Sequence, residues 1–201
     1  MQRGLGHYTS AGLGGSQRAA QRLAATARTA GVLYGIFDAL RSGQTIQSEL
    51  GFDAPSLAGL SAKEVGDRII NAIRPTDGTQ DAEASRNALA LAIADLLEQD
   101  PESDLTALTQ EQIENVTERY IARDLCHRIE LDIGKALLDK AATPLIGVQR
   151  LEEVRQYVQE RLAACFRLRR ERGERLTRSS ATGLTGQVIR DTFEVFEGYI
   201  Q

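Results

Sequence analysis

The sequence is poor in the side chains that most often build metal and catalytic centres. Its 201 residues include two histidines, two cysteines, one methionine and no tryptophan. Cys126 and Cys165 are too few for a disulfide scaffold, and such sparse use is typical of a reducing compartment. A structural zinc site needs a closed set of His and Cys ligands, and no C-x-x-C pair is present. The sequence therefore predicts neither a metal site nor a cofactor.

Long apolar runs are also missing. The longest, residues 30–37, ends at Asp38, whereas a bilayer span needs roughly 20 apolar residues. The chain also starts without the cationic and apolar segments of a signal peptide. We therefore expect a cytoplasmic protein without a membrane partner. Gly31 and Gly35 form a G-x-x-x-G pair within this run, which in a short helix indicates the close approach of another helix.

Apolar residues recur at spacings of three and four, the period of amphipathic helices. No segment shows the sustained alternation that is typical of strands. The sequence therefore predicts an all-α fold, an irregular bundle of about six helices, two of them long. The expected helices cover residues 16–41, 61–74, 81–99, 109–141, 143–173 and 185–199.

Local signals mark the starts of three of these helices. Ser61 with Glu64, and Thr109 with Gln112, have the spacing of a capping box, in which each side chain bonds the other's backbone N–H. Thr143 is followed by a proline, the usual order of a helix cap and a first helical residue.

Five glycines fall within residues 1–15, which predicts a flexible Gly-rich arm ahead of a single helical domain over residues 16–201. The arm ends in Gly12-x-Gly14-Gly15-Ser16, which is similar to part of a phosphate-binding loop. A preceding strand and a Gly-Lys-Ser/Thr ending are both missing. The arm is therefore interpreted as a plain lead-in or as a partner-binding segment, and nucleotide binding is not predicted.

Charge is divided unevenly along the chain. Residues 1–41 carry five arginines and one aspartate, residues 42–149 nine basic and nineteen acidic groups, and residues 150–190 ten arginines and five glutamates. Two basic segments therefore flank an acidic centre, and they could meet that centre or an acidic partner. Only three of the 24 basic residues are lysines. Arginine suits carboxylate or phosphate recognition, and genomic base composition is the alternative explanation.

The densest basic run lies at the expected end of the fifth helix, where cations suit the helix dipole. Nucleic-acid binding would favour interleaved aromatic residues, and only Phe166 is near. The run is interpreted as a solvated helix end, as a protein-binding surface or as a contact to a nucleic-acid backbone. Its members are Arg167, Arg169, Arg170, Arg172, Arg175 and Arg178, with Glu171 and Glu174 among them.

No catalytic constellation emerges from the sequence. Cys126 or Cys165 with His127 is the only candidate pair of nucleophile and base. Cys126 and His127 are adjacent, so on a helix their side chains point about 100° apart. Cys165 falls on an apolar helix face, where cysteine usually acts as a small core residue. The sequence therefore predicts a protein that is not an enzyme.

Three short strings, in this order along the chain, resemble the QatB family of the four-gene Qat anti-phage defence system. The resemblance extends over nearly the whole chain. The strings are His7-Tyr8 with Gly14-Gly15-Ser16-x-Arg18-Ala19-Ala20-x-Arg22, then Leu131-Asp132-Ile133-Gly134-Lys135-Ala136, and last Leu184-Thr185-x-x-Val188 with Phe196-Glu197-Gly198-Tyr199.

The resemblance implies a bacterial immune component encoded beside a P-loop ATPase, a QueC-like enzyme and a TatD-like nuclease. It implies a non-catalytic adaptor that binds the QueC-like protein and serves as a candidate protein substrate for it. Family members tend to begin with Met-Gly and a long Pro/Gly-rich stretch, whereas this chain begins Met1-Gln2-Arg3. If that stretch carries a modification, we expect this chain to represent the folded core.

Candidate partner-binding residues come from both basic segments. The alternative function is a nucleic-acid-binding accessory module that uses the same arginines, and its binding would weaken steeply with salt. The ATPase and the TatD-like nuclease are further candidate partners. The candidate residues are His7, Tyr8, Gly14, Gly15, Arg18, Arg22, Arg167, Arg169, Arg170 and Arg172.

Overall fold

The computed structural model of the chain describes residues 23–44, 54–131 and 143–198. Within these ranges the chain forms six α-helices and one 3-10 helix and contains no strand, which confirms the predicted all-α fold. The elements are α3 (Ala24–Arg41), η2 (Ala54–Leu57), α5 (Ala62–Ile73), α6 (Gln80–Gln99), α7 (Gln110–Ile129), α9 (Pro144–Glu171) and α10 (Arg178–Gly198).

The predicted caps are present at the starts of three helices. Ser61 and Glu64 form a reciprocal capping box ahead of α5, and Thr109 and Gln112 do the same ahead of α7. Thr143 caps α9, whose first residue is the predicted proline. Each such cap satisfies a backbone N–H that the helix leaves unpaired, and it contributes about 1 kcal/mol.

The last helix begins earlier than predicted. The expected start at residue 185 is wrong, because α10 spans Arg178–Gly198. The Thr177 hydroxyl accepts a hydrogen bond from the backbone N–H of Ser180, and the Thr177 N–H donates to Ser180 Oγ. This reciprocal cap uses serine where the usual signal has Glu or Gln, so the sequence pattern does not reveal it. Ala181 in the first turn is fully buried, so packing also favours the longer helix.

Parts of three predictions lie outside the described residues. These are the flexible arm over residues 1–15, the start of the first helix at residue 16, and the end of the fourth helix at residue 141. The described part of the fourth helix is α7, which ends at Ile129. The predicted fifth helix corresponds to α9, which at 28 residues is the longest helix in the described part of the chain.

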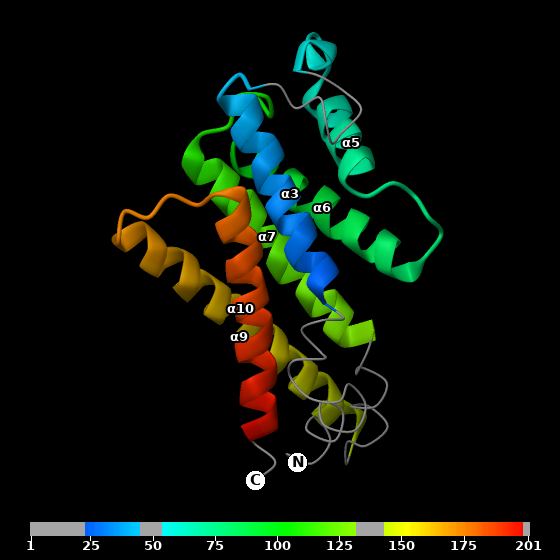
Figure 1. Ribbon diagram of the computed structural model, residues 1–201. Helices are drawn as coiled ribbons and strands as arrows, with labels where there is room; N and C mark the ends of the chain where they lie inside the picture. Colours follow the sequence, from blue (N-terminus) through cyan, green and yellow to red (C-terminus); the bar gives the residue numbers. More distant parts are fainter. Residues whose placement is uncertain (1–22, 45–53, 132–142, 199–201) are drawn as a thin grey trace.

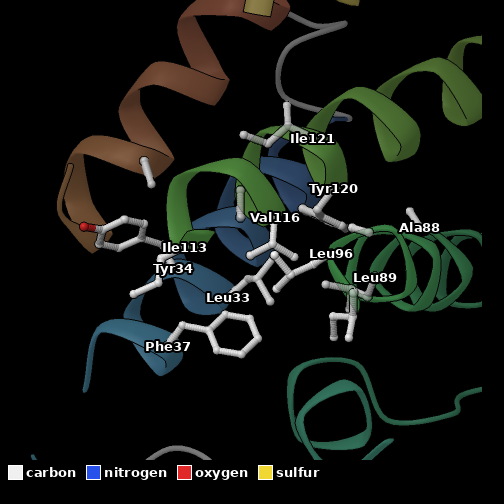
Figure 2. Packing of buried hydrophobic residues seen from close by; sticks show 14 of the residues in the cluster. Leu33, Tyr34, Phe37, Ala88, Leu89, Leu96, Ile113, Val116, Tyr120 and Ile121 are labelled. Atoms are coloured by element: carbon white, nitrogen blue, oxygen red, sulfur yellow. The ribbon is translucent and has the colours of Figure 1, made fainter. Parts of the chain in front are cut away.

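The core lies where α3, α6 and α7 meet, and α10 packs along α3 while α9 packs on α7 and α10 (Figure 1). Figure 2 shows Leu33 of α3 close to Val116 of α7 and Leu96 of α6, within one cluster that also includes Phe37 of α3 and Tyr120 of α7. All five side chains are buried. Burial of one such side chain contributes about 1.5–3 kcal/mol, so these contacts hold the three helices together.

Two glycines let α10 approach α3 closely. A Cβ atom on Gly31 would overlap Thr182 Oγ1 and lie 2.9 Å from the carbonyl oxygen of Arg178. A Cβ atom on Gly35 would lie 3.1 Å from Cδ of Arg178. The prediction that this pair admits a neighbouring helix is confirmed. The neighbour is the first part of α10, a stretch whose sequence suggests a polar link.

Candidate partner-binding surface

The predicted arginine run lies at the end of α9 and in the link to α10 (Figure 1). Val154, Val158, Leu162 and Phe166 of α9 are buried, one residue every four. Such spacing puts them on a single stripe, which faces the core where α9 packs on α7 and α10, and leaves the opposite face of the helix outside. The arginines begin directly after Phe166, where this buried stripe ends.

The end of α9 has a defined backbone. Gly173 follows the helix with a φ of +64°, the left-handed conformation that glycine adopts most easily. The backbone N–H of Glu174 donates to the carbonyl of Arg169 at 3.0 Å, which closes the last turn. The Tyr34 hydroxyl of α3 then donates to the carbonyl of Leu176 at 2.6 Å. These contacts fix the link between α9 and α10 against the core.

We call residues Arg167, Arg169, Arg170, Arg172, Arg175 and Arg178, with Glu171 and Glu174, the arginine surface. Six arginines against two glutamates give it a net charge of +4. Two of its ion pairs are long: 4.0 Å from Arg167 to Glu171, and 3.9 Å from Arg172 to Glu174. Exposed pairs of this kind contribute about 0–1 kcal/mol, so they hold the arginines only weakly.

The four arginines that the sequence singles out here have different surroundings. Arg167 and Arg172 have side chains that are 65% and 69% exposed, and Arg169 is half-buried beside Glu174 at 3.5 Å. Arg170 is exposed, and its charge acts on Glu118 of α7. Burial raises the pKa of Glu118, and the nearby Arg170 partly opposes that rise. Arg170 is thus close enough to α7 to interact with Glu118, whereas Arg167 and Arg172 face solvent.

The other candidate residues, in the first basic segment, lie outside the described residues. They stay predictions. They are His7, Tyr8, Gly14, Gly15, Arg18 and Arg22.

The cysteine–histidine pair lies in a different place. Cys126 and His127 border a hollow of about 220 Å³ between α6, α7 and α9, and Arg155 of α9 forms an ion pair with Glu130 at its edge. Burial raises the pKa of the Cys126 thiol to about 12. The thiol therefore stays protonated at neutral pH, which does not suit a nucleophile. The pKa of Cys165, a half-buried residue, is also raised by burial.

The described part of the chain contains neither a cluster of metal-ligating side chains nor a membrane-spanning helix. Within it, no group of three or more His, Cys, Asp and Glu side chains is placed to hold a metal ion. Of the helices described, none is long and apolar enough to cross a membrane.

A buried polar cluster that the sequence reasoning missed joins α3, α6 and α7. Asp124 is fully buried, and its Oδ2 accepts from Thr26 Oγ1 at 2.6 Å and from Arg128 Nε at 3.0 Å. Tyr120 donates to the same oxygen at 3.2 Å, and its hydroxyl is hydrogen-bonded to Ser85 at 2.9 Å. The spacing of Tyr120, Asp124 and Arg128 by four is the one sign of this cluster in the sequence, because it puts them on one face of α7. Their partners come from other helices, which the sequence does not reveal.

The fold and this surface define a helical bundle protein with a strongly basic outer end. The family model described as Qat anti-phage system associated protein QatB matches residues 14–196. The match covers most of the chain, so the chain belongs to the QatB family and is a component of the Qat anti-phage defence system. No curated protein and no solved structure matches the chain.

Proposed function

We propose that this chain is a non-catalytic helical adaptor that binds the QueC-like protein of its Qat system. The observation that carries the proposal is the family match over residues 14–196. The resemblance implies a QueC-like neighbour and gives this member no catalytic motif. A second part of the proposal is that the QueC-like enzyme uses this protein as a substrate through the Pro/Gly-rich N-terminal stretch that family members tend to carry.

The chemistry of the described side chains supports a non-catalytic role. Cys126 has a raised pKa of about 12 and is not activated. His127 is exposed and next to it in the chain, so it does not share the direction of the Cys126 side chain. A Cys126→Ala/His127→Ala double variant should keep full phage protection in cells that carry the whole system. Loss of protection with an intact fold would favour an enzyme instead.

Co-expression with each of the other three components tests the adaptor role. The chain carries an affinity tag, and we expect the QueC-like protein to co-purify with it. Intact mass of this chain, and of a version extended by the Pro/Gly-rich stretch that family members tend to carry, then tests the substrate role, since a covalent modification adds mass. A gain on the extended version alone would make that stretch the substrate. The ATPase and the TatD-like nuclease are assayed in parallel as further partners. If none of the three components binds, the adaptor proposal is wrong.

Nucleic-acid binding is the second candidate function. The observation that favours it is the net charge of +4 on the arginine surface, from six arginines and two glutamates. Contacts to phosphates release counterions, so binding to duplex DNA should weaken steeply between low and moderate salt. A chain that does not bind DNA even at low ionic strength would exclude this function.

A further inference from the structure

An apolar side chain lies within the arginine surface. Leu168 is 44% exposed, whereas the buried side chains of α9 before it recur every four positions and end at Phe166. It follows the buried Phe166 by two positions, which turns it about 200° around the helix, away from α7. Residues four apart share a helix face, so Leu168 lies beside Arg172. The surface therefore combines an apolar centre with charged neighbours.

The composition of this surface favours a protein partner over a nucleic acid. Glu171 and Glu174 lie among the arginines, so the cations do not form the unbroken row that would follow a phosphate backbone. The aromatic side chain nearest in sequence, Phe166, is 1% exposed and offers no ring for a base to stack on. Arginine beside an exposed apolar residue is instead a common composition of protein–protein interfaces.

The arginines are also able to change partners. Arg167 and Arg172 reach their glutamates only at 4.0 and 3.9 Å, and both side chains are mostly exposed. A carboxylate from another molecule could therefore form shorter, bidentate hydrogen bonds to these guanidinium groups with little loss inside the chain. Arg169, which is half-buried beside Glu174, is held more firmly.

A second copy of this chain is a weaker match for the surface. Two of its exposed acids, Asp100 and Asp104, already accept local hydrogen bonds. Asp104 accepts from the Thr106 backbone at 2.8 Å and hydroxyl at 2.7 Å, and Asp100 accepts from Gln112 at 3.0 Å. These carboxylates stabilise the turn between α6 and α7, so a partner would have to compete for them.

We propose that the arginine surface binds an acidic segment of a partner protein, which places an apolar side chain against Leu168 and carboxylates against Arg167 and Arg172. The inference rests on the proposed function and names the chemistry by which the partner is recognised. Because the charges are exposed, they mainly speed association and set its dependence on salt.

Paired variants of the full chain test this surface by calorimetric titration with the QueC-like protein. R167Q/R172Q removes two exposed charges here, and K63Q/R68Q removes two exposed charges from α5, on the opposite side of the view in Figure 1. We expect R167Q/R172Q to weaken binding about tenfold at low salt and K63Q/R68Q less than about threefold. L168S should also weaken binding, whereas L91S, at a leucine that is 40% exposed on α6, should not.

A synthetic peptide in which leucines alternate with glutamates, and the same peptide with lysines, provide a second probe. Binding of the acidic peptide alone, lost in R167Q/R172Q, supports the proposal even if the QueC-like protein does not bind. A QueC-like complex that R167Q/R172Q leaves unchanged overturns the surface but keeps the adaptor role. Two other results would also overturn the proposal if the acidic peptide does not bind. One is binding of duplex DNA that R167Q/R172Q abolishes, and the other is self-association in sedimentation that the same variant abolishes.

Discussion

Two arginines of this chain show opposite uses of the same side chain. Arg128 in α7 is 4% exposed, with Nε 3.0 Å from Asp124 Oδ2 and Nη1 3.2 Å from Asp81 Oδ2. Arg172 at the end of α9 is 69% exposed, and its pair with Glu174 is 3.9 Å long. A buried charge needs its partner because water cannot replace it, whereas an exposed charge is solvated without one. We therefore assign Arg128 to the fold and Arg172 to the proposed interface.

The largest expected effect comes from breaking the buried pair. Asp124→Asn removes the charge with little change of shape and leaves Arg128 buried without its main partner. We expect the free energy of unfolding, measured by urea denaturation, to fall by about 3 kcal/mol. Asp95→Asn is the matched control, because Asp95 is partly exposed and pairs with Arg123 at 2.6 Å on the surface. Equal losses in the two variants would contradict the contrast between buried and exposed pairs.

The next effect concerns the contact of α3 with α10. Gly31→Ala should lower the free energy of unfolding by about 1–3 kcal/mol, because the new Cβ overlaps Thr182 Oγ1 and forces the helices apart. At Gly183 of α10, by contrast, an added Cβ would enter open space. Gly183→Ala should therefore stabilise the chain by about 0.5–1 kcal/mol through helix propensity. A Gly31→Ala variant as stable as Gly183→Ala would show that the helices are not in close contact.

A pH-dependent effect is expected at Glu118 of α7, which lies near Arg170 of the arginine surface. Burial raises the pKa of Glu118 above its ordinary value of 4.5, so its ionised form is less favourable in the folded chain. Stability from this group is therefore present below pH 4.5 and is lost as the pH rises through the raised pKa.

Glu118→Gln should consequently be more stable than the wild type at pH 7, and the difference should vanish as the pH falls below about 4. Thermal unfolding at a series of pH values measures this. The exposed Glu153→Gln on α9 is the control and should change little at either pH. Destabilisation by Glu118→Gln at pH 7 would mean that the pairing of Glu118 with Arg170 outweighs its burial.

The smallest expected effect on stability is at the arginine surface itself. R167Q/R172Q should change the free energy of unfolding by less than about 0.5 kcal/mol, because exposed charges with long ion pairs contribute little. Urea denaturation of R167Q/R172Q and of Arg128→Gln compares the loss of exposed arginines with the loss of a buried one. If R167Q/R172Q loses about as much stability as Arg128→Gln, then Arg167 and Arg172 stabilise the fold and the contrast is wrong.

Local features of this fold can be predicted from the sequence, and features that depend on distant contacts cannot. Ser61 and Thr109 are recognisable as caps because their partners lie three residues away. The start of α10 escapes prediction because a serine completes its cap and because part of its stability comes from packing against Gly31.

The same division applies to the candidate surface. The arginine run at the end of α9 is visible as composition, and the structure places it at that helix end. The approach of Arg170 to Glu118, and the bond from Thr26 to Asp124 across 98 positions, depend on how helices pack. The exposure of Leu168 follows from its angle around α9 relative to α7, and that angle requires the packing partner to be known.

The most direct test of the account is phage protection in cells that carry the whole Qat system with R167Q/R172Q in this chain. K63Q/R68Q serves as the matched control, and the urea denaturation of both variants shows that they are folded. The account predicts that R167Q/R172Q loses protection and the complex with the QueC-like protein while its stability is unchanged. Full protection by the folded R167Q/R172Q variant would contradict it.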